Sequence, residues 1–365
     1  MESSNPVKPT NEAQTVVRDV SQSLWVDLCS PSHPFLFRSI VDALDVTGVD
    51  VTVRKKTETV PLAEEIGFDF QVIGTDFDNR ILRMAGIPLR AAQLTYAMPN
   101  CDVALCSRNV MAILAAKSRG IPSIHFTDND ITAHLDGLHV EDLYNRLEGL
   151  ATYNIVPAAF NTTQLTGLGA DPDSIHTYDG TKEDVYVAAF DPDPTFTRHL
   201  PFERYVVVRP EALTAAYVDT TESIVPQLLS GLANRDINVV YLPRGRGDEH
   251  HSDPYPPDRV YTPDEALNGL QLSWHADCVL TGSGTMAREA AAMGKPAVSF
   301  FPNHLLSVDE HLVAEGQVFH SRDPSEVVAY VDELTEPEME HDRSHSYRVR
   351  REVAQLTADL VNDVQ

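Results

Sequence analysis

A short turn near the end of the chain carries the residue types that bind a phosphate. It lies within VLTGSGTMAREAAAMGKPAVSFFP, which predicts an apolar strand, a turn, a helix rich in small residues and a second apolar strand. The turn consists of Gly282, Ser283, Gly284 and Thr285. Unpaired amides and the positive end of the helix dipole favour an anion at such a helix start. The pattern indicates a nucleotide-diphosphate site. The alternative is a glycine-rich turn that only tightens helix packing.

Charged side chains near strand ends extend this candidate site. Glu289 stands one turn into the helix, where a carboxylate is predicted to accept hydrogen bonds from ribose hydroxyls. Arg209 and Arg244 follow two other apolar strands. A guanidinium donates two parallel hydrogen bonds to phosphate oxygens. In a chain with 28 basic and 54 acidic residues, an arginine at a strand end is a candidate for neutralising a phosphate.

The first half of the chain offers a histidine after its first apolar strand. His33 lies in the segment SPSHP, and an imidazole can deprotonate an acceptor hydroxyl near neutral pH. The alternative is that Ser32 merely caps the following helix, with His33 exposed to solvent.

A second polar cluster, TDND, follows another apolar strand. Asp128 is a candidate base or a ligand for sugar hydroxyls, and Asn129 supplies a neutral donor and acceptor. His134 stands four residues after Asp130, about one turn further on. The alternative is an ordinary helix start, capped by Asp130 or Thr132, with His134 exposed.

Alternating strands and helices must position these side chains. An apolar strand over 23–29 and a helical pattern over 34–46 begin the series, and a strand over 154–156 ends its first half. The pattern restarts with a strand at 205–208. The fold class predicted is α/β, with two doubly wound, Rossmann-like domains and a ligand cleft between them.

The same pattern predicts the domain boundaries. We expect a disordered leader over residues 1–21, an acceptor domain over 22–190 and an Asp/Pro-rich linker over 191–203. A nucleotide-sugar domain over 204–345 follows, and then a final helix over 346–365 that could cross back to the first domain.

Charge and composition restrict the partners. The formal net charge is −26, and the acidic residues are spread along the chain. This distribution keeps a protein hydrated in strong salt and predicts a halophilic, archaeal source. It offers no basic stripe for nucleic acid. A polar N-terminus and the absence of a long apolar run predict a cytoplasmic protein that does not span a membrane. The four cysteines and the histidines show no metal-ligand spacing, so no metal is expected.

Three stretches carry a resemblance to a known superfamily. They are WVDLCSPSHPFLF, HFTDNDITAH and the late GSGTMAREAAAMGKP, supported by the strand VVVRPEA. The chain resembles an archaeal-centred group of unknown function within the glycosyltransferase-B and UDP-GlcNAc 2-epimerase-like superfamily. The resemblance implies that the C-terminal domain holds the nucleotide diphosphate on residues 282–285, with Glu289 on the ribose. It also implies an acceptor site in the N-terminal domain.

These observations predict a sugar-nucleotide-dependent glycosyltransferase of glycan or surface polysaccharide assembly. Arg209 or Arg244 would neutralise the leaving diphosphate, and His33 or Asp128 would activate the acceptor. The donor is a nucleotide sugar and the acceptor a glycan or a lipid-linked glycan, with no further cofactor. One alternative is a non-hydrolysing sugar-nucleotide 2-epimerase. Another is a non-catalytic binding protein on the same fold. The nucleotide base, the sugar and the oligomeric state stay open.

Overall fold

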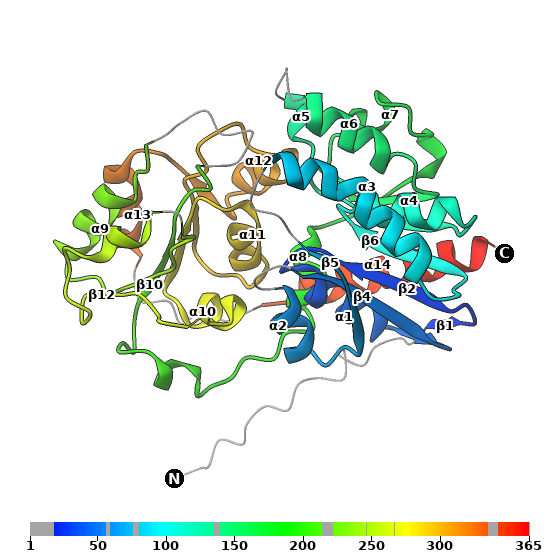
Figure 1. Cartoon of the computed structure of the whole chain (residues 1–365). Coiled ribbons are helices and arrows are strands. Elements are labelled where there is room, and N and C mark those ends of the chain that lie inside the picture. The colour runs from blue at the N-terminus through cyan, green and yellow to red at the C-terminus, as the bar shows by residue number, and fades with distance from the viewer. Residues whose placement is uncertain are drawn as a thin grey trace, which may run out of the picture.

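The computed structural model describes residues 18–55, 59–75, 80–134, 139–213, 222–245, 247–265, 267–334 and 342–364. Two parallel β-sheets lie side by side, each with helices against it, and form two lobes (Figure 1). This arrangement confirms the predicted pair of doubly wound, Rossmann-like domains. Among the helices of the described ranges, none combines the length and the apolar composition needed to cross a bilayer.

The N-terminal sheet has the strand order β5-β4-β2-β6-β7-β8-β9, and all of its pairs are parallel. Its strands are β2 (Leu24–Leu28), β4 (Val49–Lys55), β5 (Phe70–Thr75), β6 (Val103–Ser107), β7 (Ser123–Phe126), β8 (Tyr153–Pro157) and β9 (Ile175–Tyr178). Two short strands, β1 (Arg18–Val20) and β3 (Leu44–Val46), pair separately. The connections from β2 and β6 run to opposite sides of the sheet, which opens a crevice at the carboxyl ends of these two strands.

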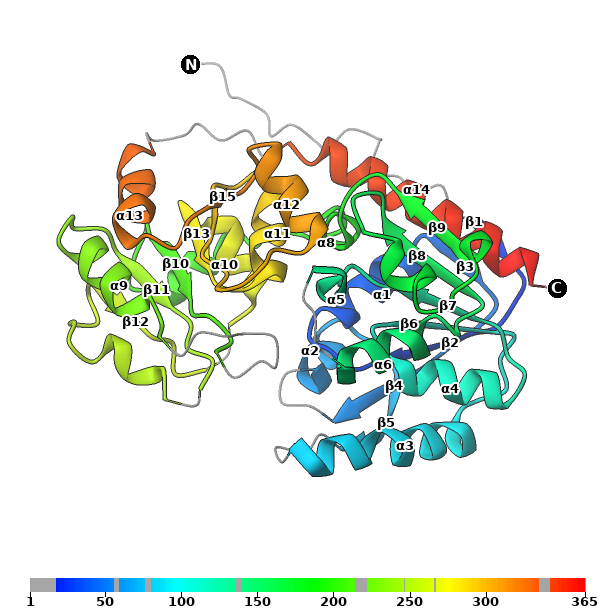
Figure 2. The ribbon, with the colours of Figure 1, turned by 90° about the horizontal axis from the view of Figure 1, so that it is seen from above.

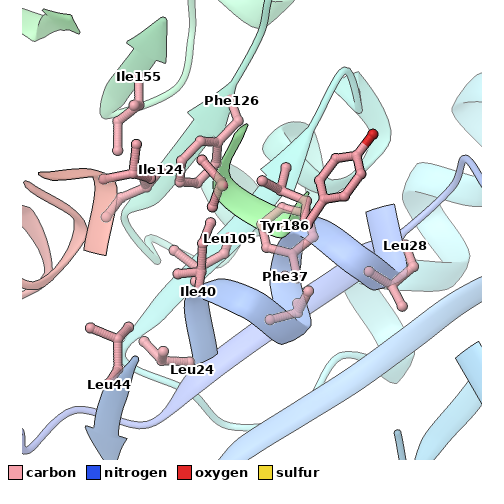
Figure 3. Packing of buried hydrophobic residues seen from close by; sticks show 14 of the residues in the cluster. Leu24, Leu28, Phe37, Ile40, Leu44, Leu105, Ile124, Phe126, Ile155 and Tyr186 are labelled. Carbon is pink, nitrogen blue, oxygen red and sulfur yellow. The ribbon is translucent and has the colours of Figure 1, made fainter. Parts of the chain in front are cut away.

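Helices cover both faces of this sheet because residues along β2 alternate between the faces. Leu24 and Leu28 pack with Phe37 and Ile40 of the first helix (Figure 3), whereas Trp25 joins the core of the opposite face. The helices of this domain are α1 (His33–Val41), α2 (Thr59–Glu65), α3 (Arg80–Ala97), α4 (Val110–Ser118), α5 (Ile131–His134), α6 (His139–Glu148), α7 (Thr163–Thr166) and α8 (Lys182–Val187).

The C-terminal sheet repeats the plan with the order β12-β11-β10-β13-β14-β15. Its strands are β10 (Val206–Arg209), β11 (Val239–Tyr241), β12 (Val260–Tyr261), β13 (Cys278–Thr281), β14 (Ala297–Ser299) and β15 (Phe319–His320). Its helices are α9 (Val225–Ala233), α10 (Gly269–His275), α11 (Gly284–Ala292), α12 (Ser307–Ala314) and α13 (Pro324–Glu333). Short 3₁₀ helices lie at Pro172–Ser174, Phe196–His199 and Glu249–Ser252. The crevice of this sheet lies between β10 and β13.

Two helices join the lobes. The last helix, α14 (Ser344–Asp363), lies along the N-terminal domain (Figure 2) and buries Val349, Val353 and Val361 in that domain's core. Helix α8 contacts α1 and α14 on one side and α11 of the C-terminal domain on the other. The side chains of α8 therefore lie where the two domains meet.

Several predicted elements differ from the observed ones. The helix expected over 34–46 ends at Val41, and residues 44–46 form β3, because they pair with β1 instead of continuing the helix. The strand at 154–156 does not end the first sheet: the more polar Ile175–Tyr178 adds an edge strand beyond it. The segment predicted as a linker over 191–203 buries Phe196 and Phe202 in the C-terminal core. The domain boundaries stay predictions. Most of the leader lies outside the described residues.

Candidate functional site

A cleft of about 400 Å³ lies between the two domains. Its N-terminal wall consists of Cys29, Ser30, Ser32, His33, Arg54, Arg108, Met111, Asp128, Asn129, Ile131, Tyr144 and Lys182. Its C-terminal wall consists of Ala212, Arg244, Gly282, Ser283, Gly284, Thr285, Arg288, Phe301, Leu306 and Asp309. Loops after β2, β6, β10 and β13 all reach it, so the crevices of both sheets open into one cleft.

The turn at 282–285 approaches the loop after β10 too closely for a side chain at its first position. A Cβ on Gly282 would lie 2.6 Å from Cα of Glu211. The Gly282 N–H donates to the carbonyl of Arg209 over 3.0 Å, and the Ser283 N–H donates to Oγ1 of Thr281 over 2.9 Å. These contacts fix the direction in which α11 begins.

The first turn of α11 presents unpaired amides to the cleft. Ser283 is the N-cap residue, and its side chain makes no capping hydrogen bond. Within the described part of the chain, no group accepts from the N–H of Gly284 or Thr285, although both residues line the cleft. The helix start thus has the geometry of an anion site.

Two other residues assigned to the nucleotide stand elsewhere. Oε1 of Glu289 accepts a hydrogen bond from the Tyr186 hydroxyl over 2.7 Å, and Glu289 is not part of the cleft lining. Position 289 faces α8, not the cleft, which differs from its expected place on a ribose. The Arg209 side chain also lies outside the lining, whereas Arg244 is part of it and donates from Nε to the carbonyl of Pro210 over 2.7 Å.

His33 is the first residue of α1 and is almost fully buried in the wall of the cleft. Ser32 makes no side-chain capping bond, so the structure differs from the simple capping alternative. The Cys29 N–H donates to Nδ1 of His33 over 3.4 Å, and Sγ of Cys29 lies 3.7 Å from the same nitrogen. While Nδ1 accepts from this N–H, the proton of a neutral imidazole is on Nε2, so a base at Nε2 requires the other tautomer, with the Nδ1 proton directed at Sγ of Cys29. Cys29 thus influences which tautomer His33 adopts.

Asp128 does not have the properties of a base. Its Oδ2 lies 2.9 Å from Nζ of Lys182 and 3.0 Å from Nη2 of Arg288. Burial alone would raise its pKa, but these two cations outweigh burial and hold the pKa well below its usual range. A carboxylate with so low a pKa accepts protons poorly. This position corrects the prediction that Asp128 is a candidate base. Sequence spacing could not reveal this low pKa, because Arg288, one of the two cations, is 160 residues away from Asp128.

Arg288 connects the two domains through carboxylates. Besides Asp128, its Nη1 contacts Asp309 at 2.8 Å and its Nε lies 3.1 Å from Glu183 of α8. Burial raises the pKa of Glu183 and outweighs the lowering by Arg288 and Lys182, and the nearby Asp128 charge adds to the rise. These residues, together with Lys182, form the interdomain ion cluster. No motif or spacing in the sequence indicates this role for Lys182 or Arg288.

The remaining predicted residues lie on one side of the cleft. Asn129 lines it, and its Oδ1 accepts from the Ile131 N–H over 3.2 Å. His134 stands outside the lining and bridges the domains: its Nε2 lies 3.0 Å from Oγ of Ser307, and its ring stacks on His304. Oδ1 of the fully buried Asp130 accepts from the Ser307 N–H over 3.1 Å, so an N-terminal residue caps α12 of the other domain.

Comparison with known proteins identifies a family and a homologous protein. A family described as a protein of unknown function (DUF354) matches residues 22–363. An uncharacterised protein of Methanocaldococcus jannaschii is 26% identical over 327 residues, which cover 86% of this chain and 92% of the relative.

Solved structures share the fold at low identity. The UDP-GlcNAc 2-epimerase of M. jannaschii, in complex with UDP-GlcNAc and UDP, has a TM-score of 0.69 at 13% identity, covering 92% of this chain and 99% of that one. The glycotransferase of kitacinnamycin has a TM-score of 0.57 at 17% identity, with 94% and 99% covered. The fold is therefore that of glycosyltransferases and sugar-nucleotide epimerases. Since the family match extends over nearly the whole described chain, the protein belongs to the DUF354 family.

Proposed function

We propose that this protein is a nucleotide-sugar-dependent glycosyltransferase whose donor diphosphate binds at the start of α11. The observation that carries the proposal is the pair of unpaired amides, on Gly284 and Thr285, that face the interdomain cleft. Amides of this kind and the helix dipole stabilise a diphosphate, and Arg244 supplies a cation in the same wall. The kinship of fold with proteins solved in complex with UDP supports this assignment.

His33 would supply the base for transfer. As the acceptor oxygen attacks C1 of the sugar, the bond from C1 to the diphosphate oxygen breaks, and the hydroxyl proton passes to Nε2 of His33. The nucleoside diphosphate leaves with the bonding electrons, and the amides of α11 stabilise its growing negative charge.

The carboxylates of the cleft favour transfer over epimerisation. Epimerisation at C2 needs acid and base groups on both faces of the sugar. Of the described residues that line the cleft, two are carboxylates, Asp128 and Asp309, and Arg288 holds both of them. One base suffices for an inverting transfer.

A substitution at the N-cap of α11 tests the proposal. Ser283→Asp places a carboxylate that accepts from the first-turn amides, so the free protein should keep or raise its Tm. The added charge repels a diphosphate, and we expect nucleoside diphosphate affinity to fall by about 100-fold. Ser283→Asn, which caps without charge, is the matched control and should lose less. Calorimetric titration with UDP, GDP, ADP, CDP and TDP measures this. Unchanged affinity in Ser283→Asp would remove the diphosphate from α11 and overturn the proposal.

A sugar-nucleotide 2-epimerase is the second candidate, favoured by the high structural similarity to UDP-GlcNAc 2-epimerases. Incubation with UDP-GlcNAc in D2O distinguishes the two. Epimerisation through C2 deprotonation introduces deuterium at C2, which NMR detects without any acceptor. A transferase leaves C2 protonated.

A further inference from the structure

The cleft reverses the charge of the molecule. The whole chain has 54 acidic and 28 basic residues. Among the residues that the structure describes, the cleft lining has two carboxylates, Asp128 and Asp309, but five cations: Arg54, Arg108, Lys182, Arg244 and Arg288. Glu148 and Glu183 contact three of these cations from outside the lining, which leaves five cations against four carboxylates in this set of described residues. This local excess of positive charge attracts anionic ligands.

Three of these cations already have a place in the site described above. Lys182 and Arg288 belong to the interdomain ion cluster, and Arg244 stands in the wall that contains α11. The other two stand on the opposite, N-terminal wall: Arg54 lies near the carboxyl end of β4, and Arg108 directly follows β6. The diphosphate site at α11 therefore gives no role to this second pair.

The backbone of Arg108 adopts an unusual conformation that the structure holds in place. Its φ is +43°, in the left-handed region that non-glycine residues rarely adopt. Its N–H donates to the carbonyl of Phe126 over 3.2 Å, and its carbonyl accepts from the Tyr144 hydroxyl over 3.0 Å. Backbone strain maintained in this way is typical of ligand sites.

The guanidinium of Arg108 is held from one side. Its Nη1 donates to Oε2 of Glu148 and to Oδ1 of Asn145, both over 2.7 Å, and the Tyr144 ring lies against it. No group in the described ranges accepts from its Nε or Nη2, and Arg108 lines the cleft. The guanidinium edge left over has the fork geometry that recognises oxyanions.

The wall that holds Arg108 also holds the proposed base. Sγ of Cys29 lies 3.8 Å from the carbonyl of Arg108 and 3.7 Å from Nδ1 of His33. An anion on Arg108 would therefore belong to the molecule that His33 deprotonates.

We infer that the acceptor carries a phosphate monoester, which Arg108 and Arg54 bind on the N-terminal wall of the cleft. This inference rests on the proposed glycosyl transfer and names its acceptor class. Two guanidiniums match the double charge of a phosphate monoester better than the single charge of a carboxylate.

Binding of inorganic phosphate to the protein saturated with its nucleoside diphosphate tests the inference. With the α11 site occupied, calorimetry at fixed salt should show one further phosphate site, and acetate should bind more weakly. Arg108→Gln should weaken phosphate binding by about tenfold or more and leave nucleoside diphosphate affinity within about twofold. Arg108→Lys keeps the charge without the fork and should lose less. Arg38→Gln, on the surface of α1 in an exposed pair with Asp42, is the control and should bind like wild type.

Two results would overturn the inference. The first is the absence of a second phosphate site in the saturated protein, or one that a folded Arg108→Gln leaves unchanged. The second is an Arg108→Gln variant that binds phosphate as tightly as the wild type but binds nucleotide sugars with a carboxylate on the sugar (nucleotide hexuronates) more weakly. That result would place Arg108 on the donor sugar. Neither result touches the diphosphate site, whose failure shows separately in Ser283→Asp.

Transfer assays then distinguish the source of the phosphate. A hexose phosphate and a short-chain prenyl phosphate are offered as acceptors, each beside its unphosphorylated alcohol. The inference expects at least one phosphorylated compound to be preferred, and expects Arg108→Gln to remove that preference. Equal use of phosphate and alcohol by the wild type would contradict it.

Discussion

The C-terminal wall of the cleft presents backbone amides at the start of α11, whereas the N-terminal wall presents the side chains of His33, Arg54 and Arg108. The amides are placed by one continuous strand, turn and helix. The side chains come from three separate elements, the start of α1, the end of β4 and the loop after β6, and depend on partners far away in the sequence, such as Glu148 behind Arg108. The two walls should therefore respond differently to substitution. Changes in the C-terminal wall should act by altering the backbone, and changes in the N-terminal wall by removing a reactive or charged side chain.

The largest effect is expected at His33, where a change should affect the chemistry of the N-terminal wall and leave the other wall intact. His33→Gln keeps a polar side chain but cannot take up the acceptor proton. We expect kcat to fall by about 10²- to 10⁴-fold, with donor affinity unchanged. Release of nucleoside diphosphate from the donor measures the rate. If donor affinity falls together with kcat, the two walls do not act separately.

Arg288 links the walls, so its removal should weaken both. Arg288→Met leaves the buried carboxylates of Asp128 and Asp309 without their shared cation and should cost about 3–5 kcal/mol in the free energy of unfolding. Arg235→Met removes an exposed pair with Asp332 and should cost less than about 1 kcal/mol. Urea unfolding compares the two variants. A loss at Arg288 as small as at Arg235 would argue against the interdomain ion cluster as a stabilising element.

Gly282 tests the backbone character of the C-terminal wall. The Cβ of Gly282→Ala would meet the backbone of Glu211, so we expect a loss of about 1–3 kcal/mol in stability and weaker nucleoside diphosphate binding. Gly269→Ala, at a position with no atom within 4 Å of the added Cβ, is the matched control and should be near neutral. Thermal unfolding with and without UDP measures both. A fully stable Gly282→Ala with normal binding would show that the turn tolerates a side chain.

Glu289 offers a pH-dependent contact between α8 and α11. Burial raises the pKa of Glu289 to about 7 from its ordinary value of 4.5. The folded protein therefore holds more protons than the unfolded chain between these pH values, and stability falls as the pH rises through this window. Glu289→Gln should remove this dependence and stabilise the protein at pH 8 by about 2 kcal/mol. Unfolding free energies from pH 4.5 to 8 measure it. Parallel profiles for both proteins would exclude Glu289 as the titrating group.

The fold was largely predictable because it depends on local patterns. Continuous apolar strands separated by helices indicate parallel, two-sided sheets, and β2, β6 and β7 are buried along their whole length. Short or polar strands such as β9 and β12 were missed. They have few apolar residues and are defined by the edges they complete, which a local pattern does not contain.

The site was predictable on one wall only. Residues 282–285 are consecutive, so their types alone indicate amides at a helix start. The low pKa of Asp128 depends on Lys182 and Arg288, and the orientation of Arg108 toward the cleft depends on its positive φ and on its contact with Tyr144. These contacts join residues that are 36–160 positions apart, and no spacing rule connects them. Glu289 shows the converse limit: its distance along the helix suggested a ribose, but its face of α11 is directed at Tyr186.

The position of α14 has a consequence for how the chain is made. Its valines 349, 353 and 361 complete the core of the N-terminal domain, although they are the last of that core to leave the ribosome. The core of the N-terminal domain therefore stays incomplete, with part of its apolar surface exposed, until the C-terminal domain has been synthesised. A fragment ending near residue 190 should aggregate, and supplying residues 342–365 as a separate peptide should rescue it.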